Sequence, residues 1–200
     1  MSDHAAREEA IIATALDLAE SRGVAGVTTA GLARSLEFTE AALYRYFPSK
    51  GAIIAATLRH LGNRLFATMM LELMPEAVGH GHAVQPQLER HIQRFTLKSG
   101  LLVELLLAAA GGREEELQAT GCDFLKRYGE RMTEYFRQLQ ALEQLAAAAP
   151  PSELSRLWIC QLLGGFVLAR LAREPWDPVG HPGFQAFVGA LQTSGSAAPR

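Results

Sequence analysis

The sequence predicts an all-α protein in which a small N-terminal helix-turn-helix domain is followed by a larger helical bundle. Apolar residues recur at helical spacing along most of the chain, and no segment shows the apolar–polar alternation of a half-buried strand. Two short helical segments also stand close together near the N-terminus. With 200 residues, 48% hydrophobic and 20% charged, the chain has the composition of a globular protein and not of a disordered one.

The first four expected helices are delimited by capping and breaking residues. They cover residues 8–22, 28–36, 40–47 and 50–74. Short hydroxyl side chains cap helix starts by accepting from backbone N–H groups, glycine ends helices, and proline cannot continue one. The residues expected to cap or end these helices are Gly23, Thr28 or Thr29, Thr39, Pro48, Ser49 and Pro75.

A bundle of longer helices is expected for the rest of the chain. A connector over residues 79–86 precedes helices over 87–110 (which Ser99 and Gly100 could interrupt), 114–147, 152–172 and a last one ending near 192. The expected stops and caps are Gly111, Gly112, Pro150, Pro151 and Ser152. The 114–147 helix carries an apolar stripe of Leu125, Tyr128, Met132, Tyr135, Leu139 and Leu142. Residues 194–200 are expected to form a disordered tail.

The net charge of the chain excludes the class of strongly basic proteins that coat nucleic acid through bulk positive charge. Lys and Arg number 19 against 21 Asp and Glu, which gives a net charge of -2. Any nucleic-acid site must therefore be local. Between residues 41 and 71 the chain has basic side chains and no acidic one, which predicts a positive surface there. These basic residues are Arg45, Lys50, Arg59 and Arg64.

The sequence indicates a soluble, cytoplasmic chain without a membrane partner, metal or cofactor. The N-terminus lacks the basic-then-apolar pattern of a secretory signal, and the apolar stretch 101–110 is shorter than the ~20 residues of a membrane helix. Cys122 and Cys160 are expected to be small buried apolar residues and not a redox pair. His80 and His82 have metal-ligand spacing without a neighbouring acid or thiol. No catalytic motif occurs, so an enzyme is the least supported class.

The segments 28–36 and 39–47 have the spacing of a helix-turn-helix. In that motif the second helix enters the major groove and its first turn meets the bases. The first turn here is Thr39, Glu40, Ala41 and Ala42, while Tyr44, Lys50 and the N–H groups that start the fourth helix suit phosphate oxygens. The same helix spacing also occurs in bundles that never bind DNA.

The run TTAGLARSLEFTEAALYRYFPSK, residues 28–50, closely resembles the DNA-binding module of TetR/AcrR-type regulators. AIIATALDLAESRG before it resembles the first helix of that family. The T-EAALYR-FPSK pattern is similar in particular to the SlmA-like branch, which contains a nucleoid-occlusion factor. The resemblance covers about residues 10–60, and the remainder matches only in layout. It implies backbone contacts by Thr28 and Thr29, base contacts by Thr39, Glu40, Ala41 and Ala42, and phosphate contacts by Tyr44, Tyr46 and Lys50.

Three features depart from the pattern of the family. Glu37 and Phe38 stand in the turn, where the family usually has glycine and an aliphatic residue, and a left-handed Glu37 would cost ~1–2 kcal/mol. An acid near the DNA face could also narrow the bound sequences or weaken binding. Tyr46 replaces a frequent histidine, and Arg7 is the only basic residue ahead of the first helix, which argues against an arm that reads the minor groove.

The predicted domains are a DNA-binding domain over residues 5–50 and a regulatory and dimerisation domain over residues 51–193. Tyr128, Met132, Phe136 and Trp158 could line a small-molecule cavity, or they are plain packing. The resemblance implies that the last two helices pair with their copies in a two-fold dimer, where Gly164 and Gly165 would allow close backbone approach. The expected interface residues are Trp158, Leu162, Gly164, Gly165 and Phe166, with packing inside one chain as the alternative.

The expected function is that of a sequence-specific transcriptional regulator, most often a repressor, which binds a palindromic operator as a homodimer and is released by a small-molecule effector. One alternative is a nucleoid-occlusion adaptor that binds DNA at many sites and also contacts a cell-division protein. Another is a helical binding protein whose helix-turn-helix has lost DNA affinity. Residues 1–60, with six basic against seven acidic side chains, motivate this second alternative.

Overall fold

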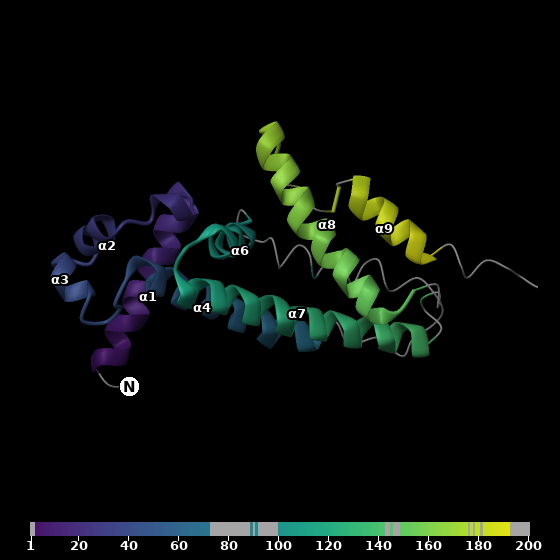
Figure 1. Cartoon of the computed structure of the whole chain (residues 1–200), viewed down its shortest axis with the longest axis horizontal. Coiled ribbons are helices and arrows are strands. Elements are labelled where there is room, and N and C mark those ends of the chain that lie inside the picture. Colours follow the sequence, from purple (N-terminus) through teal and green to yellow (C-terminus); the bar gives the residue numbers. More distant parts are fainter. Residues whose placement is uncertain are drawn as a thin grey trace, which may run out of the picture. The chain divides into compact units, whose positions relative to one another are not determined.

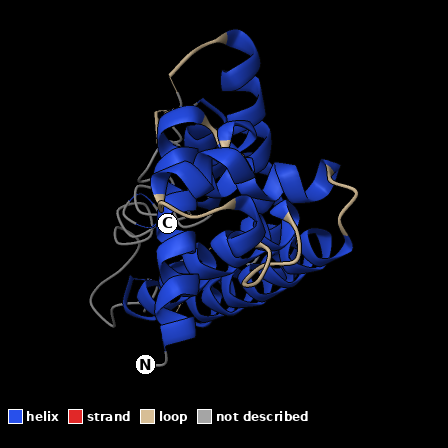
Figure 2. Cartoon of the chain, turned by 90° about the vertical axis from the view of Figure 1, so that its left-hand side faces the viewer, coloured by secondary structure: helices blue, strands red, loops and turns tan. Residues whose placement is uncertain are grey.

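The computed structural model describes residues 3–72, 89, 91, 100–142, 145, 149–175, 177, 179–180 and 182–192. The expected connector with His80 and His82, Ser99, Pro75 and the tail 194–200 lie outside the described residues. Within the described ranges the chain is helical and has no strand, so the all-α prediction is confirmed (Figure 2).

The helices follow the predicted order (Figure 1). They are α1 Asp3–Arg22, the 3₁₀ turn η1 Val24–Gly26, α2 Thr29–Ser35, α3 Glu40–Leu43, α4 Lys50–Glu72, α6 Leu101–Gly111, α7 Glu115–Ala141, α8 Pro151–Ala172 and α9 Pro182–Gln192. Gly23 ends α1 in a positive-φ conformation, as expected, and Gly100 precedes α6 in the left-handed region with φ 70°.

Four predicted helix boundaries are wrong. Helix α1 begins at Asp3 and not at residue 8, so Arg7 lies within the helix and not ahead of it. Helix α3 ends at Leu43, because hydrogen bonds of the 3₁₀ type follow it in the backbone. The Tyr46 N–H, for example, donates to the Leu43 carbonyl three residues back, shortly before Pro48. Helix α7 ends at Ala141, which leaves Leu142 outside the helix and exposed. Ser152 does not cap α8, since the helix begins at Pro151, whose fixed φ and missing N–H suit the first helical position.

The chain divides into two compact units, and the division does not fall at residue 50. Unit 1 comprises the described residues of 1–64 and 98–124, and unit 2 those of 65–97 and 125–200. The segment 98–124, with α6 and the start of α7, therefore packs with the predicted DNA-binding helices. One contact that joins them is the Val24 N–H, which donates to Glu104 Oε2 at 3.2 Å. The predicted split at 50 stays a prediction about function.

The core of unit 1 is built from the apolar faces of its helices. Leu32, Ala33 and Leu43 are buried as predicted, whereas Phe47 is only half-buried. Further buried side chains come from α1, the α1–α2 connection, α4 and α6: Ile11, Ala15, Val27, Ile53, Leu58, Val103 and Leu105. This core fixes the positions from which α2, α3 and the start of α4 present their polar residues.

The core of unit 2 is aromatic and contains a buried polar group. Trp158 Nε1 donates to the Tyr128 hydroxyl at 2.8 Å, and His91 Nε2 lies 3.0 Å from the same oxygen. Burial raises the pKa of the Tyr128 phenol, and the hydrogen bond from Trp158 opposes that rise. Tyr128 is therefore a neutral hydrogen-bonding centre of the core at any ordinary pH.

Helix α8 is long and apolar enough to cross a membrane by length and composition alone, a feature that the sequence-based predictions did not include. Its apolar character has a simpler explanation on one side: Leu154, Trp158, Leu162, Phe166 and Ala169 are buried in unit 2 at three- and four-residue spacing. Apolar residues on its other side are exposed and need a different explanation.

Candidate nucleic-acid interface

The two short helices of unit 1 have the capped starts that the sequence predicts. The Gly31 N–H donates to Thr28 Oγ1 at 3.0 Å, and the Ala42 N–H donates to Thr39 Oγ1 at 3.1 Å. Both threonines have extended backbone angles and precede the first helical residue. Side-chain caps of this kind stabilise a helix start by about 1 kcal/mol. The starts of α2 and α3 are therefore set locally by Thr28 and Thr39.

The turn between α2 and α3 is a Schellman motif with a glutamate at the left-handed position. The Phe38 N–H donates to the Ala33 carbonyl at 2.8 Å and the Glu37 N–H to the Arg34 carbonyl at 3.4 Å. Glu37 has φ 56°, in the region that normally favours glycine. Glu37 therefore adopts the left-handed conformation whose cost the sequence analysis considered, and it bears the backbone strain of this turn.

We predict that Glu37→Gly raises the free energy of unfolding by about 1 kcal/mol, because it relieves the left-handed strain at a small entropic cost. Equilibrium urea unfolding measures the change. Arg173→Gly is the matched comparison, since Arg173 ends α8 with φ 58°. Glu37→Ala is expected to bring no gain, because alanine keeps the Cβ. A Glu37→Gly variant that is no more stable than wild type would contradict the strain argument.

A side-chain hydrogen bond ties α2 to α3. Thr29 Oγ1 donates to Glu40 Oε2 at 2.5 Å. The Glu40 carboxylate, in the first turn of α3, is thus held toward α2 while the residue remains exposed. In this arrangement Glu40 orients α3 relative to α2, and its role as a base contact stays a prediction.

The nine predicted DNA-contacting residues all lie in unit 1 and keep some exposed surface. Tyr44 has an exposed fraction of 50%, which is large for an aromatic side chain. The exposed members are Thr28, Thr39, Glu40, Ala41 and Tyr44, and the half-buried ones are Thr29, Ala42, Tyr46 and Lys50. These exposures leave part of every member's surface accessible to a partner.

Tyr46 lies in an aromatic cluster that the sequence analysis did not predict. Its ring centroid lies 4.8 Å from that of His4 and 6.4 Å from that of Phe38. The Arg7 guanidinium in turn lies over the Phe38 ring at 5.6 Å. Two of the departures from the family pattern, Phe38 and Tyr46, therefore pack together against the N-terminal turns of α1. A local pattern could not reveal this, because His4 meets Tyr46 only in the folded chain.

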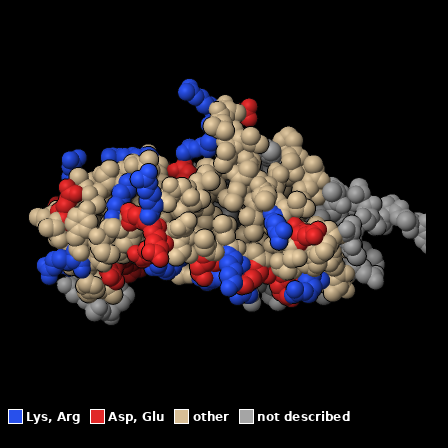
Figure 3. Space-filling model, in the orientation of Figure 1, with Lys and Arg blue, Asp and Glu red and all other residues tan. Residues whose placement is uncertain are grey.

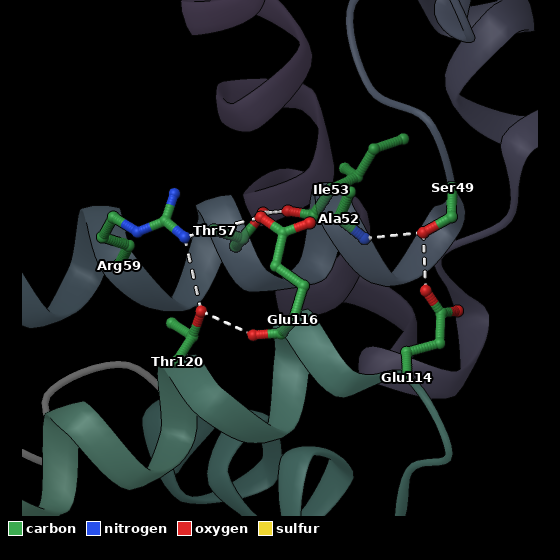
Figure 4. Close-up of polar contacts among 8 residues, drawn as sticks. All are labelled: Ser49, Ala52, Ile53, Thr57, Arg59, Glu114, Glu116 and Thr120. Atoms are coloured by element: carbon green, nitrogen blue, oxygen red, sulfur yellow. Dashed lines mark hydrogen bonds and ion pairs between the residues drawn. The ribbon is translucent and has the colours of Figure 1, made fainter.

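The N-terminus of α4 is already occupied by side-chain acceptors (Figure 4). The Ala52 N–H donates to Ser49 Oγ at 3.0 Å, which confirms Ser49 as a cap. The Ser49 hydroxyl donates to Glu114 Oε2 at 2.5 Å, and the Gly51 N–H donates to Glu114 Oε1 at 3.1 Å. Two of the backbone N–H groups expected to meet phosphate are thus bonded within the chain. Glu114 was missed because it lies 63 residues from Gly51 in sequence.

Arg59, one of the four predicted cations, is paired within unit 1. Arg59 Nη2 lies 3.3 Å from Thr120 Oγ1 and 3.6 Å from Glu116 Oε1, at the start of α7 (Figure 4). Arg45 remains exposed and Lys50 half-buried. On the face drawn in Figure 3, Lys and Arg are interspersed with Asp and Glu and form no continuous basic surface. The charge available to meet a phosphate backbone is therefore local, as the composition indicates.

The residues predicted to line a ligand cavity form the core of unit 2. Tyr128, Met132, Phe136 and Trp158 are all buried. An open groove of about 530 Å³ runs between α7 and α8, but other residues line it, among them Lys126, Gly129, Ser155 and Arg156. A cavity lined by the four core residues stays a prediction.

The predicted dimer residues fall on two sides of α8. Trp158, Leu162, Gly165 and Phe166 are buried within the chain itself, whereas Gly164 is exposed. Three leucines that were not among the predicted interface residues are exposed on this helix: Leu157 by 55%, Leu168 by 60% and Leu171 by 77%. Helix α8 has apolar residues on two sides, so their spacing in the sequence does not predict which side is buried in the core.

Two further features of the described residues concern metal binding and the state of the two cysteines. No group of three or more His, Cys, Asp or Glu side chains that could hold a metal ion occurs there. Cys122 and Cys160 are free thiols, and both are exposed, so the expectation that they are buried is wrong. They lie in different compact units.

A capped helix pair joined by a Schellman turn, inside an all-α chain with a separate aromatic helical unit, is the architecture of a helix-turn-helix DNA-binding regulator. Residues 11–57 match the family described as "Bacterial regulatory proteins, tetR family". The match covers this N-terminal segment, and together with the relatives it supports a regulator of the TetR/AcrR type with SlmA-like relatives.

Relatives support this interpretation, and solved structures show the same fold. The nucleoid occlusion factor SlmA of Marinobacter nauticus is 27% identical over 173 residues, covering 84% of this chain and 88% of the relative. SlmA of Escherichia coli is 40% identical over 70 residues, 35% of each chain. SmeT, the repressor of a Stenotrophomonas maltophilia multidrug efflux pump, has the same fold with a TM-score of 0.69 at 20% identity, over 99% of this chain and 96% of that one. The reduced form of E. coli NemR gives 0.69 at 18% identity over 93% and 95%.

Proposed function

We propose that the protein is a repressor that binds a palindromic DNA operator as a homodimer and is released by a small-molecule effector. The observation that carries the proposal is the helix-turn-helix itself: two capped helices, a Schellman turn and a Thr29–Glu40 link, all inside the segment that matches the TetR family. A rigid pair of this kind can present one helix to the major groove. The proposed location is the cytoplasm, where the DNA is.

The proposed DNA contacts follow the resemblance and the exposures. Thr39, Ala41 and Ala42 face the bases, where short side chains allow close approach and alanine can meet a thymine methyl group. Glu40 joins them at the base edge while it remains bonded to Thr29. The proposed backbone and phosphate contacts are Thr28, Thr29, Tyr44, Tyr46 and Lys50.

The homodimer is proposed to form through the exposed side of α8. Leu157, Gly164 and Leu171 are one heptad apart, and Leu168 lies one turn after Gly164. A Cβ at Gly164 would meet no atom within 4 Å, so a second helix could approach there closely. We propose this face as the interface in place of the predicted residues Trp158, Leu162 and Phe166, because their side chains are buried within the chain itself.

We predict that Leu168→Glu weakens the dimer by about tenfold, because the interface would have to bury a charge at each of the two symmetry-related positions. Light scattering coupled to gel filtration, over a range of protein concentrations, measures the change. Leu142→Glu is the matched control, since Leu142 is an exposed leucine outside α8 and is expected to leave the dimer unchanged. A monomeric wild type, or equal dimers in all three proteins, would contradict the proposed interface.

Release by an effector requires a ligand that binds the DNA-incompetent state more tightly than the DNA-competent one, since only differential affinity shifts a population. The aromatic core of unit 2 around Tyr128, Met132, Phe136 and Trp158 is where an apolar ligand would find matching surface. A broad compound screen for lowered DNA affinity tests this part. Its expected result is at least one apolar compound that weakens binding.

Selection of bound duplexes from a random DNA pool tests the function as a whole. A dimeric regulator is expected to enrich a palindrome, and the Leu168→Glu protein to enrich the same palindrome less strongly because its dimer is weaker. If neither protein enriches any sequence, the proposal is overturned and the helix-turn-helix is a structural element only.

The similarity to SlmA over most of the chain favours a second candidate, a nucleoid-occlusion adaptor that also contacts a cell-division protein. The two candidates differ in where the selected sequence occurs in the source genome. One site beside a neighbouring gene favours a local repressor. Many dispersed sites, together with a co-purifying division protein, favour the adaptor.

A further inference from the structure

We propose that Glu114 is an intramolecular competitor for the phosphate site at the start of α4 and so lowers the affinity of the protein for DNA. The inference rests on the proposed function, because it assumes that Ser49, Lys50 and the first N–H groups of α4 meet a DNA phosphate. It adds a determinant of affinity that lies outside the helix-turn-helix.

The Glu114 carboxylate occupies the hydrogen-bond donors at the start of α4 that a phosphate group would use. Its Oε2 accepts from the Ser49 hydroxyl at 2.5 Å (Figure 4), and its Oε1 accepts from the Gly51 N–H at 3.1 Å. A hydroxyl donor and an N–H group in the first turn of a helix are the donors that proteins offer to phosphate oxygens. A carboxylate and a phosphate cannot both use them, so DNA binding through these donors must displace Glu114.

The space for this contact depends on a glycine. A Cβ added at Gly51 would lie 1.9 Å from Glu114 Oε2, well inside any van der Waals contact. Gly51 is buried and has an ordinary helical environment, so backbone strain does not call for glycine there. The absence of a side chain at Gly51 therefore serves the close approach of the Glu114 carboxylate.

Glu114 lies in the connection between α6 and α7, and this connection belongs to unit 1. Helix α6 ends at Gly111 and α7 begins at Glu115, so Glu114 immediately precedes α7. In the first two turns of α7, Glu116 and Thr120 hold Arg59 of α4. A displacement of the start of α7 would thus carry Glu114 away from Ser49 and Gly51. Through this contact, the α6–α7 connection can raise or lower DNA affinity.

Glu114→Gln tests the competition, because it removes the charge and keeps the shape. Glu115→Gln is the matched control: it changes the net charge equally, one residue away, in the exposed first turn of α7. In a fluorescence-anisotropy titration of a duplex selected by the wild type, Glu114→Gln is expected to bind about three- to tenfold more tightly than Glu115→Gln. Equal affinities would overturn the proposal. Weaker binding by Glu114→Gln would also overturn it, since Glu114 would then organise the site and not compete for it.

A second measurement does not need DNA and separates this proposal from the proposed function. Inorganic phosphate is added to ¹⁵N-labelled protein, and the backbone amide signals of Gly51 and Ala52 are followed. These signals are expected to shift in the Glu114→Gln protein and to stay in place in the Glu115→Gln protein. No difference between the two variants overturns the competition. If the amides respond as expected but no variant binds any duplex, the proposed function fails while the phosphate site stands.

Discussion

Trp158→Ala is expected to lower the free energy of unfolding by about 3–5 kcal/mol, a large loss for a single substitution. Trp158 is fully buried in unit 2, where its ring centroid lies 6.1 Å from that of Phe184 and 5.7 Å from that of Phe187. Removing it opens a large cavity and deprives the Tyr128 hydroxyl of its 2.8 Å donor. Equilibrium urea unfolding, followed by circular dichroism, measures the loss.

Tyr128→Phe is the companion variant for this prediction. It keeps the ring and removes the oxygen that Trp158 and His91 share, so a smaller loss of about 1–3 kcal/mol is expected. A Trp158→Ala protein that loses less than Tyr128→Phe would show that Trp158 is not part of the core. Such a result would also favour the sequence-based prediction that Trp158 lies in a dimer interface.

The double variant Tyr44→Ala/Lys50→Ala is expected to weaken DNA binding by on the order of 100-fold at moderate salt. Loss of the Lys50 charge should also lower the slope of log affinity against log salt by about one. Tyr44 is half-exposed just past α3, and Lys50 is the first residue of α4, so neither supports a core. Fluorescence anisotropy with a selected duplex measures both effects.

Lys126→Ala is the charge-matched control for this double variant. Lys126 is an exposed lysine in unit 2, and its loss changes the net charge as Lys50→Ala does. The control is expected to bind DNA within about twofold of the wild type, since long-range charge effects on binding are screened by salt. Equal losses for Lys126→Ala and the double variant would mean that only net charge matters and that the assigned contacts are wrong.

The predictions that were confirmed rest on short-range chemistry. Thr28, Thr39 and Ser49 cap helices because a hydroxyl oxygen accepts from an N–H group three residues on, a contact that neighbouring residues alone determine. Glu37 takes the left-handed position because the two helices need a tight turn between them. Local patterns of this kind, together with the resemblance of residues 28–50 to a known module, were enough for the fold class and for the caps of the two short helices.

The features that the sequence did not reveal depend on contacts between distant residues. Glu114 reaches Gly51 from another helix connection, and no spacing rule relates the two. His4 and Tyr46 meet only because α1 packs beside the end of the helix-turn-helix. Helix α8 is apolar on two sides, so periodicity alone could not show that Trp158 points into the core while Leu168 is exposed. Each case needed the three-dimensional packing to decide it.

The central claim is that the helix-turn-helix of this chain binds duplex DNA through phosphate contacts. It is tested most directly by titrating the wild-type protein with its selected duplex at salt concentrations from about 50 to about 200 mM. The logarithm of the affinity is expected to fall linearly with the logarithm of the salt concentration, with a smaller slope for Tyr44→Ala/Lys50→Ala. No binding to any duplex at the lowest salt, or an affinity that does not change with salt, would contradict it.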